Sequence, residues 1–264
     1  MTTKYRSVIS PEKMNSGNKN ILIVFDATGC AQVSMHTATE LASRLQSGIK
    51  ALYIEDINLL NAVDLPFTRE VSLHTAAISS IDLASMKQRF QADAETIKKQ
   101  IEEIAISHSV SLTFSSMRGH KTQVIRERTE EVNMVLIPAV YSSTGRERQH
   151  HLKHEVVVVY DEHNPSSDSA LNIALLQAAK KNYQLFIIAD SEHAKQHVEQ
   201  MVSHYSGHAA CQFADFSRVD EITSLLYKHI PALFVLPENS SLIRDEKILQ
   251  QLIDSLESDI LLVQ

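Results

Sequence analysis

Two apolar runs, each ending at an aspartate, most constrain what this chain can fold into. The first is ILIVFD (residues 21–26) and the second is VVVVYD (residues 156–161). Neither run alternates polar with apolar residues, which is typical of parallel strands that helices cover on both faces. Open α/β sheets bind their ligands at the carboxyl ends of such strands. Asp26 and Asp161 are therefore the first candidate site residues.

Strand-like and helix-like segments alternate through both halves of the chain. LYIED (residues 52–56) is matched by FIIAD (residues 186–190), and VLIPAVYSS (residues 135–143) is matched by FVLPENSS (residues 234–241). Because these landmarks recur in the same order as the two aspartate runs, they predict an internal duplication of a parallel α/β unit. Apolar residues at steps of three and four also predict one long helix, which contains Met86, Phe90, Ala94, Ile97, Ile101 and Ile104.

The repeat gives a division into domains. We expect a first unit over residues 19–145, with an irregular insertion at 57–80, and a second, shorter unit over residues 155–264. Residues 146–154 are then a linker. Residues 1–18 are polar and are expected to be a disordered leader.

The matched segments resemble the universal stress protein family in its tandem two-domain form. In the first half they are NILIVFDATG, HTATELASRL and IKALYIED, and in the second they are EVVVVYDE, ALNIALLQAA, YQLFIIAD and LESDILLVQ. The resemblance spans nearly the whole chain. It implies an α/β fold of two Rossmann-like, adenine-nucleotide-binding units with parallel sheets, packed about a pseudo-two-fold. It also implies a cytoplasmic stress-response protein in which Asp26 lies beside bound ATP, with Asp161 as the second-half counterpart.

Glycine is scarce, at 6 of 264 residues, well below the average of about 7%. Family members that bind ATP carry several glycines after the fourth strand, and here only Gly145 follows it. The phosphate-binding motif is therefore degenerate, and a hydrophilic linker is the simpler interpretation of this segment. The sequence leaves the ligand unidentified: ATP and AMP are the candidates, and a monophosphate or cyclic nucleotide needs fewer such contacts. The candidate site comprises Asp26, Ala27, Thr28, Ile54, Pro138, Ser142, Ser143, Thr144 and Gly145.

The insertion has two interpretations. It is either a lid whose Arg69 or His74 reaches into the first pocket, or an ordered loop whose apolar residues Leu65, Phe67, Val71 and Leu73 close part of the core. Long irregular segments are often functional, but we favour the loop.

Motifs for metal binding or catalysis are weak. His193, His197, His204 and His208 have spacings that suit one helix face, yet a solvated surface is favoured over a metal site because no carboxylate or cysteine completes the set. Cys30 and Cys211 have no redox or metal spacing. We therefore expect no catalytic residue and no metal ligand.

Charge and hydropathy narrow the function classes. A net charge of −7 argues against a nucleic-acid partner, and the apolar runs are too short to span a membrane. Three hypotheses remain: a cytoplasmic regulatory protein that binds an adenine nucleotide, an interaction scaffold whose pockets are filled by its own side chains, and a slow ATPase. Self-association is also expected if the last segment, DILLVQ, forms an exposed edge strand that pairs across a dimer.

Overall fold

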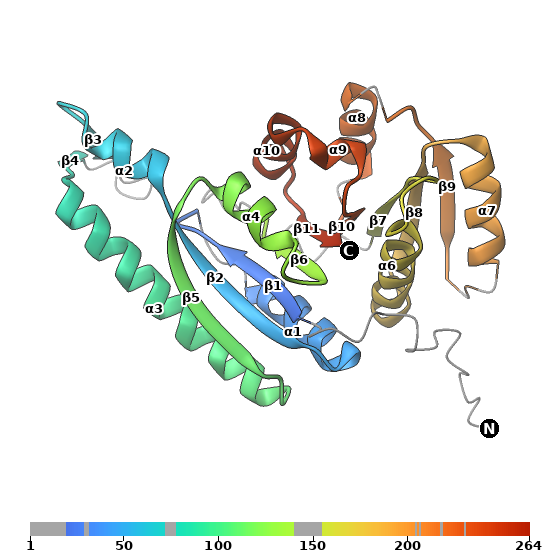
Figure 1. Cartoon of the computed structure of the whole chain (residues 1–264), viewed down its shortest axis with the longest axis horizontal. Helices are drawn as coiled ribbons and strands as arrows, with labels where there is room; N and C mark the ends of the chain where they lie inside the picture. Colours follow the sequence, from blue (N-terminus) through green and yellow to red (C-terminus); the bar gives the residue numbers. More distant parts are fainter. Residues whose placement is uncertain are drawn as a thin grey trace.

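A nine-stranded sheet forms the centre of the molecule (Figure 1). The computed structural model describes residues 20–28, 32–71, 78–139, 155–203, 205, 207–216, 219–229 and 231–264. The strands of the sheet are β1 (Asn20–Phe25), β2 (Gly48–Asp56), β5 (Leu112–Gly119), β6 (Met134–Ile137), β7 (Glu155–Tyr160), β8 (Gln184–Ala189), β9 (Ala209–Phe213), β10 (Leu233–Pro237) and β11 (Asp259–Val263). The helices are α1 (Gln32–Leu45), α2 (Ile57–Val63), α3 (Leu83–Ser107), α4 (Lys121–Thr129), α6 (Ser167–Lys181), α7 (Glu192–Val202), α8 (Val219–His229), α9 (Ser241–Arg244) and α10 (Glu246–Ser255).

Strands from the two halves of the chain meet at the middle of the sheet, in the order β5-β2-β1-β6-β11-β10-β7-β8-β9. All neighbouring strands are parallel except β6 and β11, which are antiparallel. The strands β1 and β7 therefore run in opposite directions, and their carboxyl ends lie at opposite edges of the sheet. The α/β class with a mainly parallel sheet is confirmed, whereas the boundaries of the two predicted units stay a prediction.

The expectation that DILLVQ forms an exposed edge is wrong. Strand β11 lies between β6 and β10 and pairs with both. All five of its residues are buried, as expected for an apolar run without alternation in the interior of a sheet.

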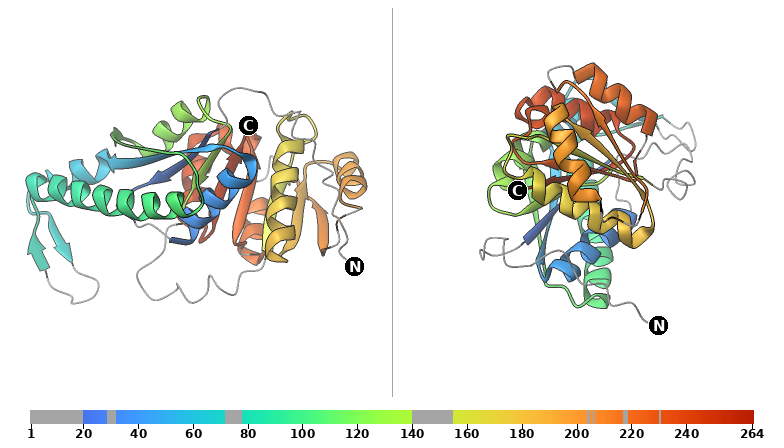
Figure 2. Two further views of the ribbon diagram at one scale, coloured as in Figure 1. Left: turned by 90° about the horizontal axis from the view of Figure 1, so that it is seen from below. Right: turned by 90° about the vertical axis from the view of Figure 1, so that its right-hand side faces the viewer.

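Helices cover both faces of the sheet (Figures 1 and 2). Alternate side chains of β1 enter two separate cores: Ile21 and Phe25 belong to one, and Leu22 and Val24 to the other. Helices α1, α3, α6 and α7 pack on the first face, and α4, α8, α9 and α10 pack on the second. The predicted periodicity of the long helix is confirmed, because five of the residues on its predicted face are buried in the first core: Phe90, Ala94, Ile97, Ile101 and Ile104.

The insertion forms a short projecting arm made of α2, β3 (Arg69–Val71) and β4 (Ile78–Ser80), where sequence analysis expected no regular structure (Figure 1). Leu60 of α2 is buried in the first core, but apolar side chains farther along the arm are exposed: Leu65 by 63%, Phe67 by 97% and Val71 by 55%. The favoured interpretation is therefore wrong for Leu65, Phe67 and Val71, which do not close the core; Leu73 is not among the described residues. Strands of three residues that pair only with each other offer no buried face for these side chains. His74 lies outside the described residues.

Candidate functional site

Asp26 follows β1 and lies at the carboxyl edge of the first-half strands. Its side chain is buried, and its Oδ2 lies 2.6 Å from the Lys121 ammonium. The Thr28 backbone N–H donates to Oδ1 at 2.8 Å, and the Thr28 hydroxyl donates to the same oxygen. Burial acts to raise the pKa of Asp26, but Lys121 and Thr28 outweigh it and hold the pKa below the ordinary value of 3.8. Asp26 is therefore an ionised carboxylate in a nearly dry ion pair.

Lys121 is a candidate site residue that sequence analysis missed. It is the first residue of α4, whose N-cap residue His120 makes no side-chain capping bond. Helix N-termini carry free N–H groups and a partial positive charge, so this end of α4 and the ammonium together form a positive site beside Asp26. A lysine at the start of a helix opposes the helix dipole, which was the one sequence signal that it needed a carboxylate partner.

Some of the other predicted site residues lie near the Asp26–Lys121 pair. Ala27 and Thr28 lie in the exposed turn after β1, Ile54 is fully buried on β2, and Pro138 is buried directly after β6. Because β1 pairs with both β2 and β6, these residues occupy three neighbouring strand ends. The remaining four candidates, Ser142, Ser143, Thr144 and Gly145, lie outside the described residues.

A second buried carboxylate reaches the same edge from the other half of the chain. Asp259 is the first residue of β11 and is 2% exposed. Its Oδ1 accepts hydrogen bonds from the Ser34 hydroxyl of α1 at 2.8 Å and from the Ala139 N–H after β6 at 3.0 Å. Sequence analysis missed Asp259 because it placed β11 at an edge of the sheet rather than beside β6.

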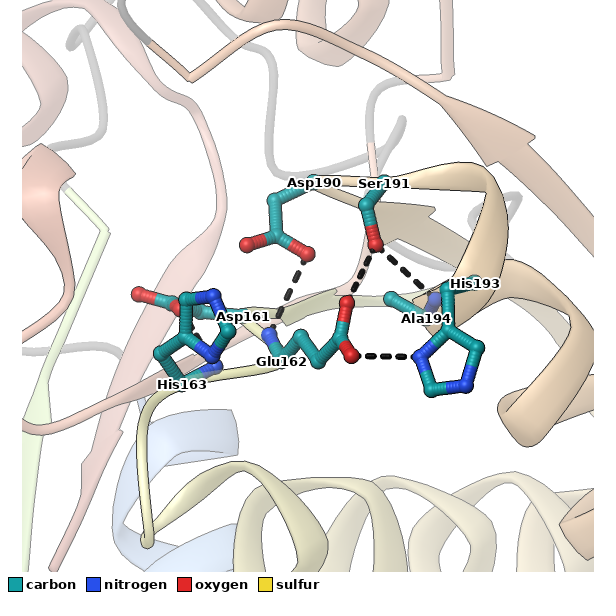
Figure 3. A network of polar contacts seen from close by, with 7 residues as sticks. All are labelled: Asp161, Glu162, His163, Asp190, Ser191, His193 and Ala194. Carbon is teal, nitrogen blue, oxygen red and sulfur yellow. Dashed lines mark hydrogen bonds and ion pairs between the residues drawn. The ribbon is translucent and has the colours of Figure 1, made fainter.

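The second half presents a different arrangement around Asp161, shown in Figure 3. The Asp161 carboxylate accepts from the His163 N–H at 3.1 Å, and the neighbouring Glu162 N–H donates to Asp190 at 3.1 Å. Burial raises the pKa of the Asp190 carboxyl, and the negative charge of Asp161 raises it further. Asp161 is thus placed beside a second acidic group, whereas Asp26 is placed beside a lysine.

Glu162 connects the loop after β7 to the start of α7 (Figure 3). Its carboxylate accepts from the Ser191 hydroxyl at 2.7 Å and pairs with His193. The Ser191 hydroxyl and the His193 ring lower the pKa of Glu162. Ser191 also caps α7 by accepting from the Ala194 N–H at 2.9 Å.

The change Ser191→Ala should lower the free energy of unfolding by about 1 kcal/mol, because it removes the N-cap of α7. Chemical denaturation followed by circular dichroism measures this change. Ser203→Ala, at the opposite end of α7, is the matched control, because Ser203 is exposed and its hydroxyl donates to the Gln200 carbonyl within the same helix end. Equal effects of the two changes would contradict the capping role of Ser191.

Among the described residues, no cluster of three or more histidine, cysteine, aspartate or glutamate side chains is arranged to hold a metal ion. His193 instead pairs with Glu162, and the His197 ring lies 6.0 Å from the Tyr160 ring. His204 lies outside the described residues. None of the described helices has the length and apolar character needed to cross a bilayer.

Comparison with known proteins identifies the fold. A universal stress protein from Archaeoglobus fulgidus DSM 4304 superposes with a TM-score of 0.53 over 92% of this chain and 96% of its own, at 11% identity. The chain has the universal stress protein fold. A putative universal stress protein from Pseudomonas aeruginosa UCBPP-PA14 gives 0.48 over 94% and 93% of the two chains, also at 11% identity. A universal stress protein in complex with cAMP gives 0.31 over 41% of this chain and 96% of its own, at 15% identity.

Sequence comparison gives no further assignment. No protein-family model matches the chain, and no curated protein matches it. The likeness to universal stress proteins is therefore a likeness of fold.

Proposed function

We propose that this chain is a non-catalytic regulatory protein, built from two tandem units, that binds an adenine nucleotide at the carboxyl edge of its first half. The observation that carries the proposal is the contact between Asp26 and Lys121 at the uncapped start of α4. It combines, at one place, a carboxylate for ribose hydroxyls and a positive site for phosphate.

Asp26 and Lys121 both have hydrogen-bonding positions that their contact with each other does not use. An ionised carboxylate has about four acceptor sites and an ammonium has three donors. Thr28 and Lys121 use three of the acceptor sites on Asp26, which leaves one for a ribose hydroxyl. The Lys121 ammonium and the first N–H groups of α4 remain for phosphate oxygens, as at other anion-binding helix N-termini.

The charge at this site favours a nucleotide with few phosphate groups. One ammonium and one helix dipole of roughly half a charge face a carboxylate that already neutralises much of the ammonium. A triphosphate brings more negative charge than this arrangement offsets, and glycines that would let more backbone N–H groups approach are scarce. AMP or a cyclic nucleotide is therefore the expected ligand in preference to ATP.

Titration calorimetry with AMP, cAMP and ATP tests the proposal on the parent protein and on two matched variants, Asp26→Asn and Asp161→Asn. Loss of a hydrogen bond to a charged acceptor costs about 1.5–3 kcal/mol, so Asp26→Asn should weaken binding by roughly 10- to 100-fold. Asp161→Asn changes the counterpart residue of the second half and should leave the dissociation constant unchanged. Circular dichroism at the same temperature checks that both variants remain folded.

The opposite pattern, with binding lost in Asp161→Asn and retained in Asp26→Asn, would move the site to the second half. Equal retention in both variants would remove these carboxylates from nucleotide recognition altogether.

A second candidate function is an interaction scaffold without a small-molecule ligand. It is favoured by the internal satisfaction of the first-half edge, where Thr28 and Lys121 engage Asp26 and where Asp259 accepts from Ser34 and Ala139. This function predicts no change in the melting temperature of the parent protein with any nucleotide at millimolar concentration. The regulatory function predicts an increase that grows with nucleotide concentration.

A further inference from the structure

A small cavity lies where the two halves of the chain meet, on the first face of the sheet. Thr37 of α1 lines it from the first half, and Gln177 of α6 and Asp259 of β11 line it from the second. Its volume is about 30 Å³, which exceeds the roughly 10–15 Å³ that a buried water needs. Small-molecule sites begin at roughly 300 Å³, so the cavity has room for water but not for an organic ligand.

Gln177 is the polar residue that calls for an occupant of this cavity. It is 2% exposed and lies among the buried residues of α6, between Ala174 and Ala178. Its side-chain Nε2 is enclosed and has no hydrogen-bond partner within the part of the chain that the structure describes. Buried donors are nearly always paired with protein or with ordered water, because an unpaired one loses its bonds to bulk water and gains none. An acceptor inside the cavity would restore that bond.

Direct contacts between α1 and α6 hold the walls of the cavity in place. The Lys180 ammonium lies 2.8 Å from the Glu40 carboxylate, and the Arg44 guanidinium donates to the Leu176 carbonyl at 3.2 Å. Both contacts lie within one turn of Gln177 along α6. They fix the spacing of the two helices, so the gap beside Gln177 does not close by a shift of α6 alone.

The lining groups select a neutral occupant over an ion. A cation is disfavoured because the Gln177 Nε2 presents hydrogens to the cavity. An anion is disfavoured by the buried Asp259 carboxylate. Lys181, which also lines the cavity, is partly exposed, and its ammonium lies over the Tyr183 ring at 5.8 Å from the ring centroid. A water molecule suits this mixed lining, because it accepts and donates hydrogen bonds and carries no charge.

We propose that the cavity binds an ordered water molecule that joins the two halves of the chain. The water accepts from the Gln177 Nε2 and donates to the Thr37 hydroxyl oxygen and to the Asp259 carboxylate. Three such bonds are typical of a buried water, and a carboxylate accepts several hydrogen bonds. Because Thr37 belongs to the first half and the other two residues to the second, the water bridges them. This site goes beyond the proposed nucleotide binding, since it uses neither Asp26 nor Lys121.

Oxygen-17 magnetic relaxation dispersion of the full chain tests the proposal, because it counts water molecules that stay bound for longer than the protein takes to tumble. Gln177→Met removes the donor at nearly constant length, and Thr37→Val removes the hydroxyl at nearly constant shape. Each variant should lose one long-lived water relative to the parent protein. Gln100→Met makes the same change at an exposed position of α3 and is the matched control, which should lose none.

The melting temperature gives a second readout whose sign depends on the water. If the water is bound, Gln177→Met breaks a water-mediated contact and should lower the melting temperature by about 2–4 °C. If it is not bound, the same change removes an unpaired buried donor and should raise the melting temperature. Such an increase, or equal counts of long-lived water in the parent, Gln177→Met and Thr37→Val, would overturn the proposal. Thr37→Val keeps the test valid if Gln177→Met impairs folding.

Discussion

Lys121→Met should lower the free energy of unfolding by about 3 kcal/mol, because it leaves the Asp26 carboxylate buried without its cation. Both side chains of the pair are only about one-tenth exposed, so water can compensate little for the lost partner. A loss of this size corresponds to a fall in melting temperature of roughly 6–12 °C for a chain of this length. Denaturation in urea and differential scanning calorimetry measure the two quantities.

A double-mutant cycle measures the interaction free energy between Asp26 and Lys121 separately from their other contacts. Asp26→Ala should also destabilise the protein, since it leaves the Lys121 ammonium unpaired, but Asp26→Ala with Lys121→Met should cost less than the sum of the two single changes. Their coupling should be about 2 kcal/mol, within the range found for residues in direct contact. Additive effects would show that the 2.6 Å contact contributes no stability.

The same pair should make stability depend on acid pH. The pKa of Asp26 in the folded protein lies below its ordinary value of 3.8, so the unfolded chain binds this proton first as the pH falls. The contribution of the pair is then complete above the unfolded pKa and is lost as the pH falls through the folded pKa. A comparison of parent and double variant between pH 2 and pH 7 should show their unfolding free energies converging at the acid end.

Asp259→Ala should be the second strongly destabilising change, with a loss of about 3 kcal/mol. Hydrogen bonds to a charged acceptor contribute about 1.5–3 kcal/mol each, and unpaired buried donors add a cost. The substitution leaves the Ser34 hydroxyl and the Ala139 N–H without this carboxylate. Urea denaturation followed by both fluorescence and circular dichroism measures the loss and reveals whether the two halves still unfold together.

Asp259→Asn is the matched control for charge. Its amide oxygen can still accept from Ser34 and Ala139, so it should cost about half as much as Asp259→Ala. Ser34→Ala removes one donor to Asp259 and should cost about 1 kcal/mol. If Asp259→Ala unfolds at the same urea concentration as the parent protein, Asp259 does not hold the junction between the halves.

The strands and the long helix were predictable because their signals are local. Residues 21–25 and 156–160 show no alternation, which indicates burial on both faces, and the spacing of Phe90 to Ile104 specifies one helix face. The arm was missed because α2 is short and its ribbon strands have three residues each. Such segments carry too few residues for a period to be visible.

The candidate site was only partly predictable, because its contacts join residues far apart in the chain. Asp26 was identified from its place at the end of a strand. Lys121 and Asp259 were not, since their partners Asp26 and Ser34 are fixed by the order of strands in the sheet rather than by any sequence motif. Only the strand order brings Asp259, from the last strand, beside α1 of the first half.

The antiparallel contact between β6 and β11 has an electrical consequence. Because β1 and β7 run in opposite directions, Asp26 and Asp161 lie beyond opposite ends of the strands. They are separated by at least the length of a strand, which is roughly 17–20 Å. Charges interact over about 8 Å at physiological ionic strength. Protonation of Asp190 is therefore screened from the Asp26–Lys121 pair, although one continuous sheet joins these two sites mechanically.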